Sequence, residues 1–175
     1  GILDADTMLN MPDFRAHEHA FMMMSQVAGR AGRRGSRGKV FLQTRNPQLP
    51  VIQQVVTIDC STFFSQQMEE RQAFRYPPFY HVVYVNLRHT KEPVVETAAT
   101  LLASRLRVLF GTLVLGPDKP TVARVKQQNI RKIVIKLERG IDLARVRACL
   151  RQEQKQLLAD KQYATLQVYY DVDPL

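Results

Sequence analysis

The sequence lacks any apolar run long enough to cross a membrane. Its longest nearly apolar stretch, Val108 to Gly116, has under half of the roughly 20 residues that a spanning helix needs. The chain opens on Gly1, without the charged, apolar and small-residue order of a signal peptide. We therefore expect no membrane partner, and we expect the chain to be a piece of a longer protein.

Cysteine is also scarce, since Cys60 and Cys149 are the only two and neither has a CxxC partner. This spacing favours neither a disulfide framework nor a zinc knuckle. We expect a reduced cytoplasmic setting in which both thiols are buried as small hydrophobic groups. The sequence has two pairs of candidate metal ligands, His17 with His19 and Asp4 with Asp6. Side chains two residues apart diverge on a helix, so we expect no metal site in this chain.

Two signatures of ATP binding are missing as well. The chain has neither a G-x-x-x-x-G-K-[ST] phosphate loop nor an acidic DExH-type metal site. It therefore cannot hold ATP and magnesium unaided, and we expect no ATP hydrolysis by this chain alone.

Positive charge, by contrast, is abundant, with a formal net charge of +9 and a pI near 9.9. Residues 1–76 carry 9 basic and 7 acidic side chains, whereas residues 77–175 carry 16 and 9, so most of the surplus lies in the second part. Lysines and arginines that neutralise phosphates release condensed counterions on binding. The composition thus favours a polyanionic partner for a C-terminal domain.

Hydrophobic periodicity changes at Pro77-Pro78. Before this point, it predicts a helix, a short strand and two further helices, over residues 17–31, 39–44, 47–58 and 59–76. The apolar stripe of the first helix is expected to contain Ala20, Met23, Val27 and Ala31. Asp59 is the expected N-cap of the last of these helices.

From residue 79 onward the pattern becomes strand, helix, strand pair, helix, strand. The expected ranges are 80–88, 92–110, 122–126, 131–138, 142–159 and 166–172, with the strand pair joined by a turn at 127–129. This is the order of a ferredoxin-like split βαβ unit. The sequence therefore predicts an α+β fold in a chain organised as segments 1–46, 47–78 and 79–175.

One face of the predicted strand pair is apolar and the other is basic. The apolar face would contain Ala123, Val125, Ile133, Ile135 and Leu137, and the basic face Arg124, Lys126, Lys132 and Lys136. If helices cover the apolar face, the basic face would also show Tyr84, Arg88 and Tyr169, so that bases could stack on aromatics while cations hold phosphates. The alternative is an ordinary solvated sheet face, which alternation alone does not exclude.

The run QVAGRAGR, residues 26–33, stands at the end of the first predicted helix. Gln26, Arg30 and Arg33 are spaced i, i+4 and i+7 and share one face, while Gly29 and Gly32 leave room for another surface. Two guanidiniums one turn apart can both reach a triphosphate and stabilise the charge that develops during phosphoryl transfer. The run thus predicts an arginine finger. The alternative is a solvated basic turn at a helix C-terminus, where cations complement the macrodipole.

Several other segments accompany this run in order along the chain. They are residues 1–6 (GILDAD), 12–16 (PDFRA), Glu18, 76–79 (YPPF), 115–117 (LGP) and 171–174 (DVDP). Together with QVAGRAGR, these segments resemble the PriA (primosomal protein N′) family of replication-restart DNA helicases, which belong to superfamily 2. The resemblance runs along essentially the whole chain.

The resemblance implies a bacterial ATP-dependent DNA helicase that moves 3′ to 5′, recognises abandoned replication forks and reloads the replisome through primosome assembly. Residues 1–46 would then end the second RecA-like lobe, and residues 47–78 would connect it to the C-terminal domain. Arg33 would be the finger at the γ-phosphate, with Arg30 and Gln26 coupling that contact to lobe closure. ATP and magnesium would be held mainly by residues before Gly1, where the family's zinc-binding cysteines would also lie.

The resemblance also implies that the C-terminal domain helps to bind the acidic tail of single-stranded-DNA-binding protein. A peptide ending in acidic residues and a carboxylate needs an arginine beside an apolar groove, and Arg145 and Arg147 are the candidates. The alternative is a charged outer helix face.

Two other hypotheses compete for the whole chain. The first is a non-catalytic single-stranded nucleic-acid-binding module whose arginines only grip phosphates. The second is another superfamily 2 helicase, such as a branch-migration enzyme of the RecG kind, which also carries a GRxGR helix. The PPF, LGP and DVDP segments argue against the second hypothesis.

Overall fold

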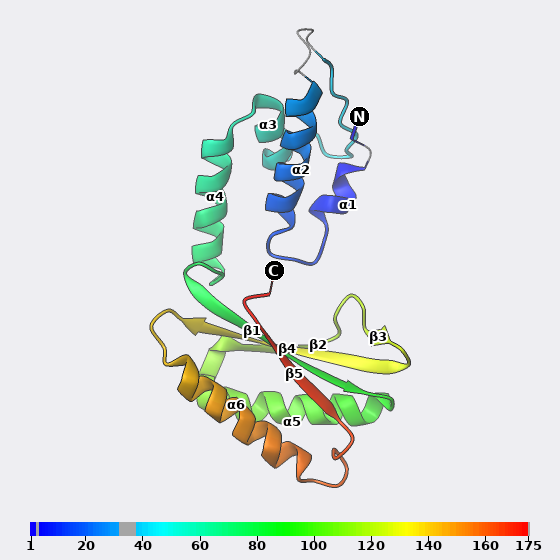
Figure 1. The fold of residues 1–175 in the computed structure, drawn as a ribbon, viewed down its shortest axis with the longest axis vertical. Coiled ribbons are helices and arrows are strands. Elements are labelled where there is room, and N and C mark those ends of the chain that lie inside the picture. Colours follow the sequence, from blue (N-terminus) through cyan, green and yellow to red (C-terminus); the bar gives the residue numbers. More distant parts are fainter. Residues whose placement is uncertain (3, 32–37, 175) are drawn as a thin grey trace. The chain divides into compact units, whose positions relative to one another are not determined.

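The structure is a computed structural model that describes residues 1–2, 4–31 and 38–174. The chain divides into two compact units, Gly1–Glu70 and Arg71–Leu175 (Figure 1). Within the described part of the chain, no helix combines the length and the apolar character that a membrane crossing requires.

The first unit is helical. Its helices are α1 (Ala5–Leu9), α2 (Ala16–Ala31), α3 (Pro50–Thr57) and α4 (Cys60–Ala73), the last of which ends in the second unit. Asp59 caps α4, because its Oδ1 accepts hydrogen bonds from the Thr62 backbone N–H at 3.1 Å and from the Ser61 hydroxyl at 3.0 Å. This confirms the predicted helix start.

The core of the first unit is centred on an aromatic stack between α2 and α4. The rings of Phe21 and Phe63 lie parallel with their centroids 4.0 Å apart, and both side chains are buried. Part of the predicted stripe on α2 is therefore wrong: Ala20 is buried, but Met23 and Val27 are 57% and 37% exposed. The helix is turned so that its bulky Phe21 fills the core in place of these residues.

The predicted strand over residues 39–44 is also wrong. In the described residues it is reduced to one parallel bridge between Leu42 and Ile2, with hydrogen bonds from Ile2 N to Phe41 O and from Gln43 N to Ile2 O. The pairing stops there because α1 begins at Ala5, so the partner segment leaves the extended conformation.

The second unit is a sheet with two helices on one side (Figure 1). Its elements are β1 (Tyr80–His89), α5 (Glu92–Phe110), β2 (Val114–Asp118), β3 (Arg124–Val125), β4 (Gln128–Glu138), α6 (Leu143–Leu158) and β5 (Gln167–Val172). The strands are antiparallel and ordered β2-β4-β1-β5, with the short β3 also paired to β4. The α+β class is confirmed, and the predicted element order holds except within the strand pair.

The hairpin prediction needs correction at its first strand. The chief partner strand is β2, and β3 keeps only two residues of the predicted 122–126 strand. The turn lies at Lys126 and Gln127, whose φ angles of 47° and 63° suit a two-residue hairpin turn. The sequence did not predict β2, because Gly and Pro at 116–117 are residues typical of a turn. The pairing of β2 with β4 shifts register between Leu115 and Asp118.

The register between β1 and β4 separates two faces of the sheet. The face toward the helices is buried and apolar, with Val83, Val85, Leu87, Ile133, Ile135 and Leu137 in the core. This confirms the predicted core positions of β4. The other face, called here the polar face, carries Tyr84, Asn86 and Arg88 of β1, Lys132 and Lys136 of β4, and Tyr169 of β5.

The short segments at residues 76–79, 115–117 and 171–174 each make specific contacts within or next to this unit's sheet. The Arg71 guanidinium donates to the carbonyl of Pro77 at 2.8 Å. A Cβ at Gly116, which has a φ of 89°, would lie 2.8 Å from the Lys132 carbonyl oxygen, so only glycine fits. Asp173 accepts from the Val82 N–H at 2.8 Å and bonds the His81 ring at 2.8 Å, which fixes the end of the chain to β1.

One charged side chain is buried beside α5. Arg131 is 2% exposed and bonds the carboxylates of Glu92, at 2.7 Å, and Glu96. Glu92 also accepts from Lys119 at 2.8 Å. The hydrogen bond from Lys119, followed by that from Arg131, lowers the pKa of Glu92 to about 2.

This lowered pKa predicts acid sensitivity. Folded Glu92 stays ionised to about pH 2, whereas the unfolded chain takes up the proton near the ordinary pKa of 4.5. Its contribution to the free energy of unfolding is therefore complete above that range and is lost as the pH falls through it. In urea titrations, Glu92→Gln should be less stable than the parent at neutral pH, and the gap should close in acid. Glu138→Gln, at the exposed end of β4, is the control; an unchanging gap for Glu92→Gln would contradict the assignment.

Candidate nucleotide and nucleic-acid sites

The last turns of α2 present part of the QVAGRAGR run. Gln26 and Arg30 are exposed on one face of the helix, as predicted from their spacing. Apart from the helix's own backbone, no atom of the described residues lies within 4 Å of where a Cβ at Gly29 would stand, so another surface could approach there. Arg33 and Gly32 lie outside the described residues. Met22, Met23 and Val27 add exposed apolar area to this end of α2.

The two aspartates among the candidate metal ligands, Asp4 and Asp6, make hydrogen bonds within the chain. Asp6 accepts from the Thr44 hydroxyl at 2.7 Å and from the Arg45 N–H at 2.8 Å, and these bonds lower its pKa. Asp4 caps α1 through the Thr7 N–H. The described residues contain no group of three or more His, Cys, Asp or Glu side chains arranged to hold a metal ion.

The thiols are less buried than predicted. Cys60 is exposed and Cys149 is partly buried. Cys60 follows the cap of α4 directly and lies on the outer side of that helix, which is why the expectation of a buried thiol fails there.

Two tyrosines of the polar face each carry a cation on the ring. Lys132 Nζ lies 4.4 Å from the Tyr84 ring centroid, and the Arg88 guanidinium carbon lies 4.5 Å from the Tyr169 centroid. In both pairs the cation is a diagonal cross-strand neighbour of the ring, two residues from the position directly opposite. The structure thus brings four predicted nucleic-acid residues together as two cation–π pairs.

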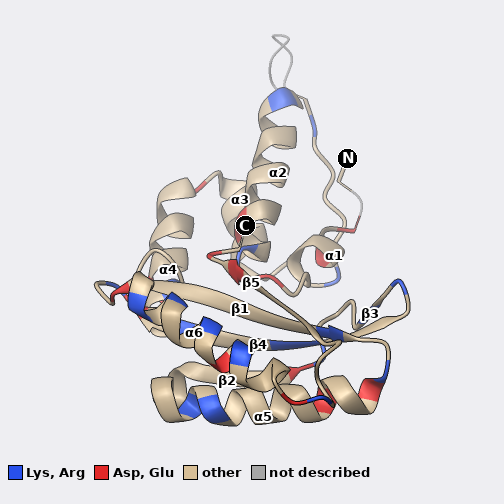
Figure 2. Ribbon diagram, turned by 60° about the horizontal axis from the view of Figure 1, so that its bottom comes forward, with Lys and Arg blue, Asp and Glu red and all other residues tan. Residues whose placement is uncertain are grey.

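Arg124 and Lys126 belong to the short hairpin formed by β3 and the start of β4. Both are exposed, Arg124 on β3 and Lys126 in the turn to β4. Figure 2 shows basic positions on β4 and at the tip of this hairpin. The register corrects the predicted basic face at Arg124, because its partner Asn129 lies opposite His89 on the side of the helices; Lys126, in the turn, carries positive charge beyond the end of the sheet.

Lys136, the fourth predicted basic residue of the hairpin, is engaged within the chain. Its Nζ donates to the carbonyl of Phe74 at 2.6 Å and lies 3.8 Å from the Tyr76 ring centroid. Desolvation, followed by the nearby charge of Arg75, lowers the pKa of Lys136. Its position therefore favours a structural role over contact with a phosphate.

The prediction of a strongly basic sheet face needs correction. Asp171 pairs with Tyr84 and Asp118 pairs with Lys132, so both place a carboxylate on the polar face. Glu138 lies opposite Tyr80 and Asp173 bonds Val82, so both carboxylates lie at the end of the sheet where β1 begins. Arg88 and Lys132 thus share the polar face with carboxylates, and Lys126 lies in the turn beyond them, where the prediction was a strongly basic face.

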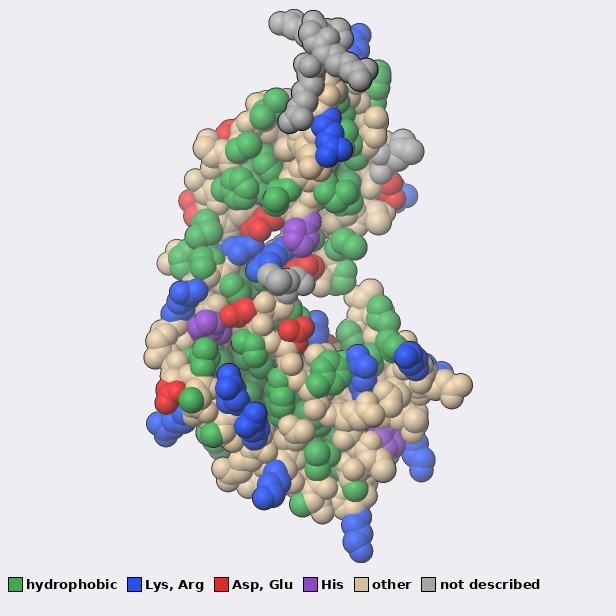
Figure 3. All heavy atoms as spheres, in the orientation of Figure 1, with side chains coloured by type: hydrophobic (Ala, Val, Ile, Leu, Met, Phe, Trp, Pro, Cys, Tyr) green, Lys and Arg blue, Asp and Glu red, His purple; other side chains and the backbone are tan. Residues whose placement is uncertain are grey.

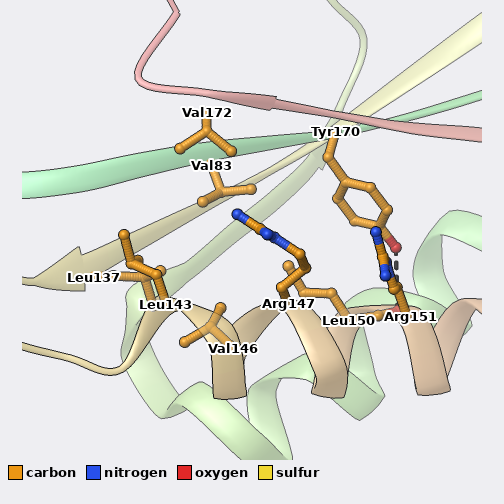
Figure 4. A pocket seen from close by; sticks show the side chains of 9 residues that line it. All are labelled: Val83, Leu137, Leu143, Val146, Arg147, Leu150, Arg151, Tyr170 and Val172. Atoms are coloured by element: carbon orange, nitrogen blue, oxygen red, sulfur yellow. Dashed lines mark hydrogen bonds between the residues drawn. The ribbon is translucent and has the colours of Figure 1, made fainter.

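A pocket of about 230 Å³ lies between α6 and the apolar face of the sheet (Figure 4). Its walls are Val83, Leu137, Leu143, Val146, Leu150, Tyr170 and Val172, with Arg147 and Arg151 at its side. The Tyr170 hydroxyl donates to the Leu150 carbonyl at 3.1 Å, and burial raises the pKa of Tyr170 to about 12, so the phenol stays neutral. Figure 3 shows hydrophobic side chains with Lys and Arg beside them in this part of the second unit.

The two predicted partner residues lie in different places. Arg147 belongs to the pocket between α6 and the sheet, whereas Arg145 lines a separate hollow with Leu109, Phe110 and Ile141. Arg151 was not among the predicted site residues, although it stands one helical turn after Arg147. The i, i+4 spacing was the available signal, but only the packing shows which arginines share the pocket.

Comparison with known proteins finds relatives for most of the chain. Residues 72–175 match the family model of the primosomal protein N C-terminal domain. The chain is similar to the replication restart protein PriA of Bacillus subtilis, with 36% identity over 146 residues, covering 82% of this chain and 18% of that protein. It is also similar to the replication restart protein PriA of Treponema pallidum, with 40% identity over 127 residues, covering 71% of this chain and 19% of that protein.

A third relative is the replication restart protein PriA of Synechocystis, with 33% identity over 138 residues, covering 78% of this chain and 17% of that protein. The chain spans less than a fifth of the length of each of these three curated relatives.

The contacts of Lys136 generate a stability prediction. Lys136→Met removes a charge-assisted hydrogen bond and should lower the free energy of unfolding by about 1–3 kcal/mol. Lys132→Met, on the same face of the same strand, removes only a cation–π contact and should cost less than about 1 kcal/mol. Urea unfolding followed by circular dichroism measures both. Equal losses for the two variants would show that Lys136 is not an anchor.

Proposed function

The chain belongs to the family of the primosomal protein N C-terminal domain, and we propose that it serves as the C-terminal part of an ATP-dependent DNA helicase that restarts replication. In this proposal the intact protein moves 3′ to 5′ on DNA in the bacterial cytoplasm, recognises stalled forks and assembles the primosome. Residues 1–46 end its second RecA-like lobe, residues 47–78 connect, and residues 79–175 contact DNA and partners.

The observation that carries the enzymatic half of the proposal is the exposed end of α2. Gln26 and Arg30 share an exposed face, and the described part of the chain leaves open space beside Gly29. Arg30 and Arg33 would meet the triphosphate of ATP, which supplies the phosphoryl group and is held with magnesium chiefly by residues outside this chain. A fixed guanidinium there stabilises negative charge that develops on the phosphoryl oxygens. The chain alone is accordingly inactive, and zinc is expected only at cysteines outside it.

The nucleic-acid half of the proposal rests on the polar face. Arg88 and Lys132 on this face, with Lys126 in the turn beyond it, place positive charge at one end of the sheet. This observation also favours the second candidate function, a non-catalytic nucleic-acid-binding module. The two candidates differ at Arg33, whose loss affects ATP hydrolysis only in a helicase. The family match over residues 72–175 weighs against a RecG-like enzyme.

The pocket beside α6 supports the proposed contact with single-stranded-DNA-binding protein. Apolar walls suit the side chains of a peptide tail, and Arg147 and Arg151 suit its carboxylates. Seen from close by, both arginines extend from α6 alongside the apolar side chains (Figure 4). Arg145 lines the other hollow, so we propose Arg147 with Arg151 as the partner residues.

The arginine finger is tested in the full-length protein. Arg33→Ala should lower DNA-stimulated ATP hydrolysis on the order of 10³-fold or more, because it removes charge stabilisation from the transferred phosphoryl group. Arg30→Ala should also lower it, while DNA affinity measured by fluorescence anisotropy should stay near the parental value. Arg45→Ala, in the same unit but outside the run, is the control. A parental turnover rate for Arg33→Ala would remove the finger from the proposal.

The partner pocket is tested with a labelled peptide that comprises the last residues of single-stranded-DNA-binding protein from the same bacterium. Arg147→Ala and Arg151→Ala should each weaken its binding about tenfold, equivalent to about 1.4 kcal/mol, since each removes a charge-assisted contact. Arg145→Ala should leave the affinity nearly unchanged. The opposite ranking, with Arg145→Ala the weakest binder, would place the peptide in the other hollow.

A further inference from the structure

We propose that the polar face holds the sugar-phosphate backbone of a nucleic acid without stacking its bases, and that Tyr84 and Tyr169 serve as supports for the cations that grip phosphates. This inference deepens the proposed function and rests on its claim that the second unit contacts DNA. The sequence left open whether this face is a stacking platform or an ordinary solvated face; in the structure, the rings of Tyr84 and Tyr169 are each paired with a cation.

The supporting geometry is the same on both sides of Asn86. Lys132 lies over the ring of Tyr84 at 4.4 Å, and Arg88 lies over the ring of Tyr169 at 4.5 Å. Asn86 pairs with Lys132 on β4 and with Tyr169 on β5, so the two cation–π pairs flank it across three neighbouring strands. The pairs are therefore built into the register of the sheet.

A base needs an open ring face in order to stack, and each of these rings has a face covered by a cation. A stacked base on that face would have to displace the cation, which loses a cation–π contact of comparable strength and moves the positive charge away from the phosphates. A phosphate that approaches Lys132 or Arg88 requires no such rearrangement, because each cation is already held on its ring. The pre-positioned charge therefore favours contact with the sugar-phosphate backbone of the nucleic acid.

The charges around the face locate the expected path of the backbone. Lys126 occupies the turn to β4, beyond Lys132, whereas Arg124 pairs with Asn129, which lies opposite His89, and so belongs to the face toward the helices. Asp118 lies opposite Lys132 and Asp171 opposite Tyr84, while the far end carries Asp173 and Lys136, which is bonded to Phe74. A polyanion is thus attracted to the hairpin end of the face and repelled from the other end.

Backbone contact has two consequences for recognition. The second unit should bind single strands with little dependence on base identity, since phosphates carry no direct sequence information. Each phosphate contact should add to the salt dependence of the association constant, with a slope contribution of about 0.7 per cation neutralised on a single strand.

The direct test compares a labelled thymidine strand with an abasic strand of the same length, built from tetrahydrofuran nucleotides. Fluorescence anisotropy on the 175-residue chain should give dissociation constants within about twofold of each other and equal salt slopes, because the two strands share one backbone. A loss of tenfold or more on the abasic strand would overturn the inference in favour of base stacking. This comparison needs no variant, so misfolding of a mutant cannot obscure it.

Variants then assign the contacts. Lys132→Gln and Arg88→Gln should weaken binding of both strands equally and each lower the salt slope by about 0.7. Tyr84→Phe, which keeps the ring, should bind like the parent, whereas Tyr84→Leu should weaken both strands to the same extent. Lys161→Gln, on the exposed segment after α6, is the charge-matched control and should bind like the parent. A Tyr84→Leu variant that loses affinity only for the thymidine strand would contradict the supporting role.

The outcomes separate this inference from the proposed function. If the chain binds the thymidine strand but not the abasic strand, only the inference is refuted. If neither the thymidine strand nor the abasic strand binds at low salt, DNA binding by the second unit is refuted, and the inference with it.

Discussion

The antiparallel register between β1 and β4 decides where the candidate binding side chains of these two strands lie. It pairs ten residues of each strand, from Tyr80 with Glu138 to His89 with Asn129. Because successive side chains alternate between faces, a shift of one residue would move the apolar residues of both strands out of the core. The same alternation places Lys132 and Arg88 on the polar face and holds them against rings of neighbouring strands.

Charged side chains in this unit differ in how much freedom their contacts leave. Arg131 is buried and satisfied by two carboxylates, and Lys136 is bonded to a backbone carbonyl. Lys132 and Arg88 rest on ring faces, a contact that holds a cation without neutralising its charge. Arginines of α6 lie beside apolar walls in the pocket. The net charge of the chain therefore overstates the positive charge available to a ligand.

Sequence periodicity predicted the long elements because each has a well-defined apolar face. α2, α5, α6, β1 and β4 were all expected close to their observed ranges. The failures arise where distant contacts override a local pattern. The Gly116-Pro117 step resembles a turn but lies within an edge strand, and the bond from Lys136 reaches a carbonyl 62 residues away in the sequence. The stripe on α2 was misassigned because the stack of Phe21 on Phe63 decides which side of that helix is buried.

For the candidate sites too, local patterns predicted some features and packing between elements determines the others. Spacing was enough to place Gln26 and Arg30 on one face, and alternation was enough to place Lys132 beside Tyr84 on another. Neither pattern could show that a cation covers the tyrosine ring, or that Arg147 shares its pocket with Arg151 and not with Arg145. These facts depend on packing between elements.

In the proposed function, the first unit supplies half of a nucleotide site and the second unit supplies a nucleic-acid surface. Equilibrium titration of the 175-residue chain with ATP and magnesium, and separately with a labelled DNA strand, tests this claim most directly. The account predicts salt-dependent binding of DNA and no saturable binding of ATP. Saturable ATP binding, or the absence of DNA binding at low salt, would contradict it.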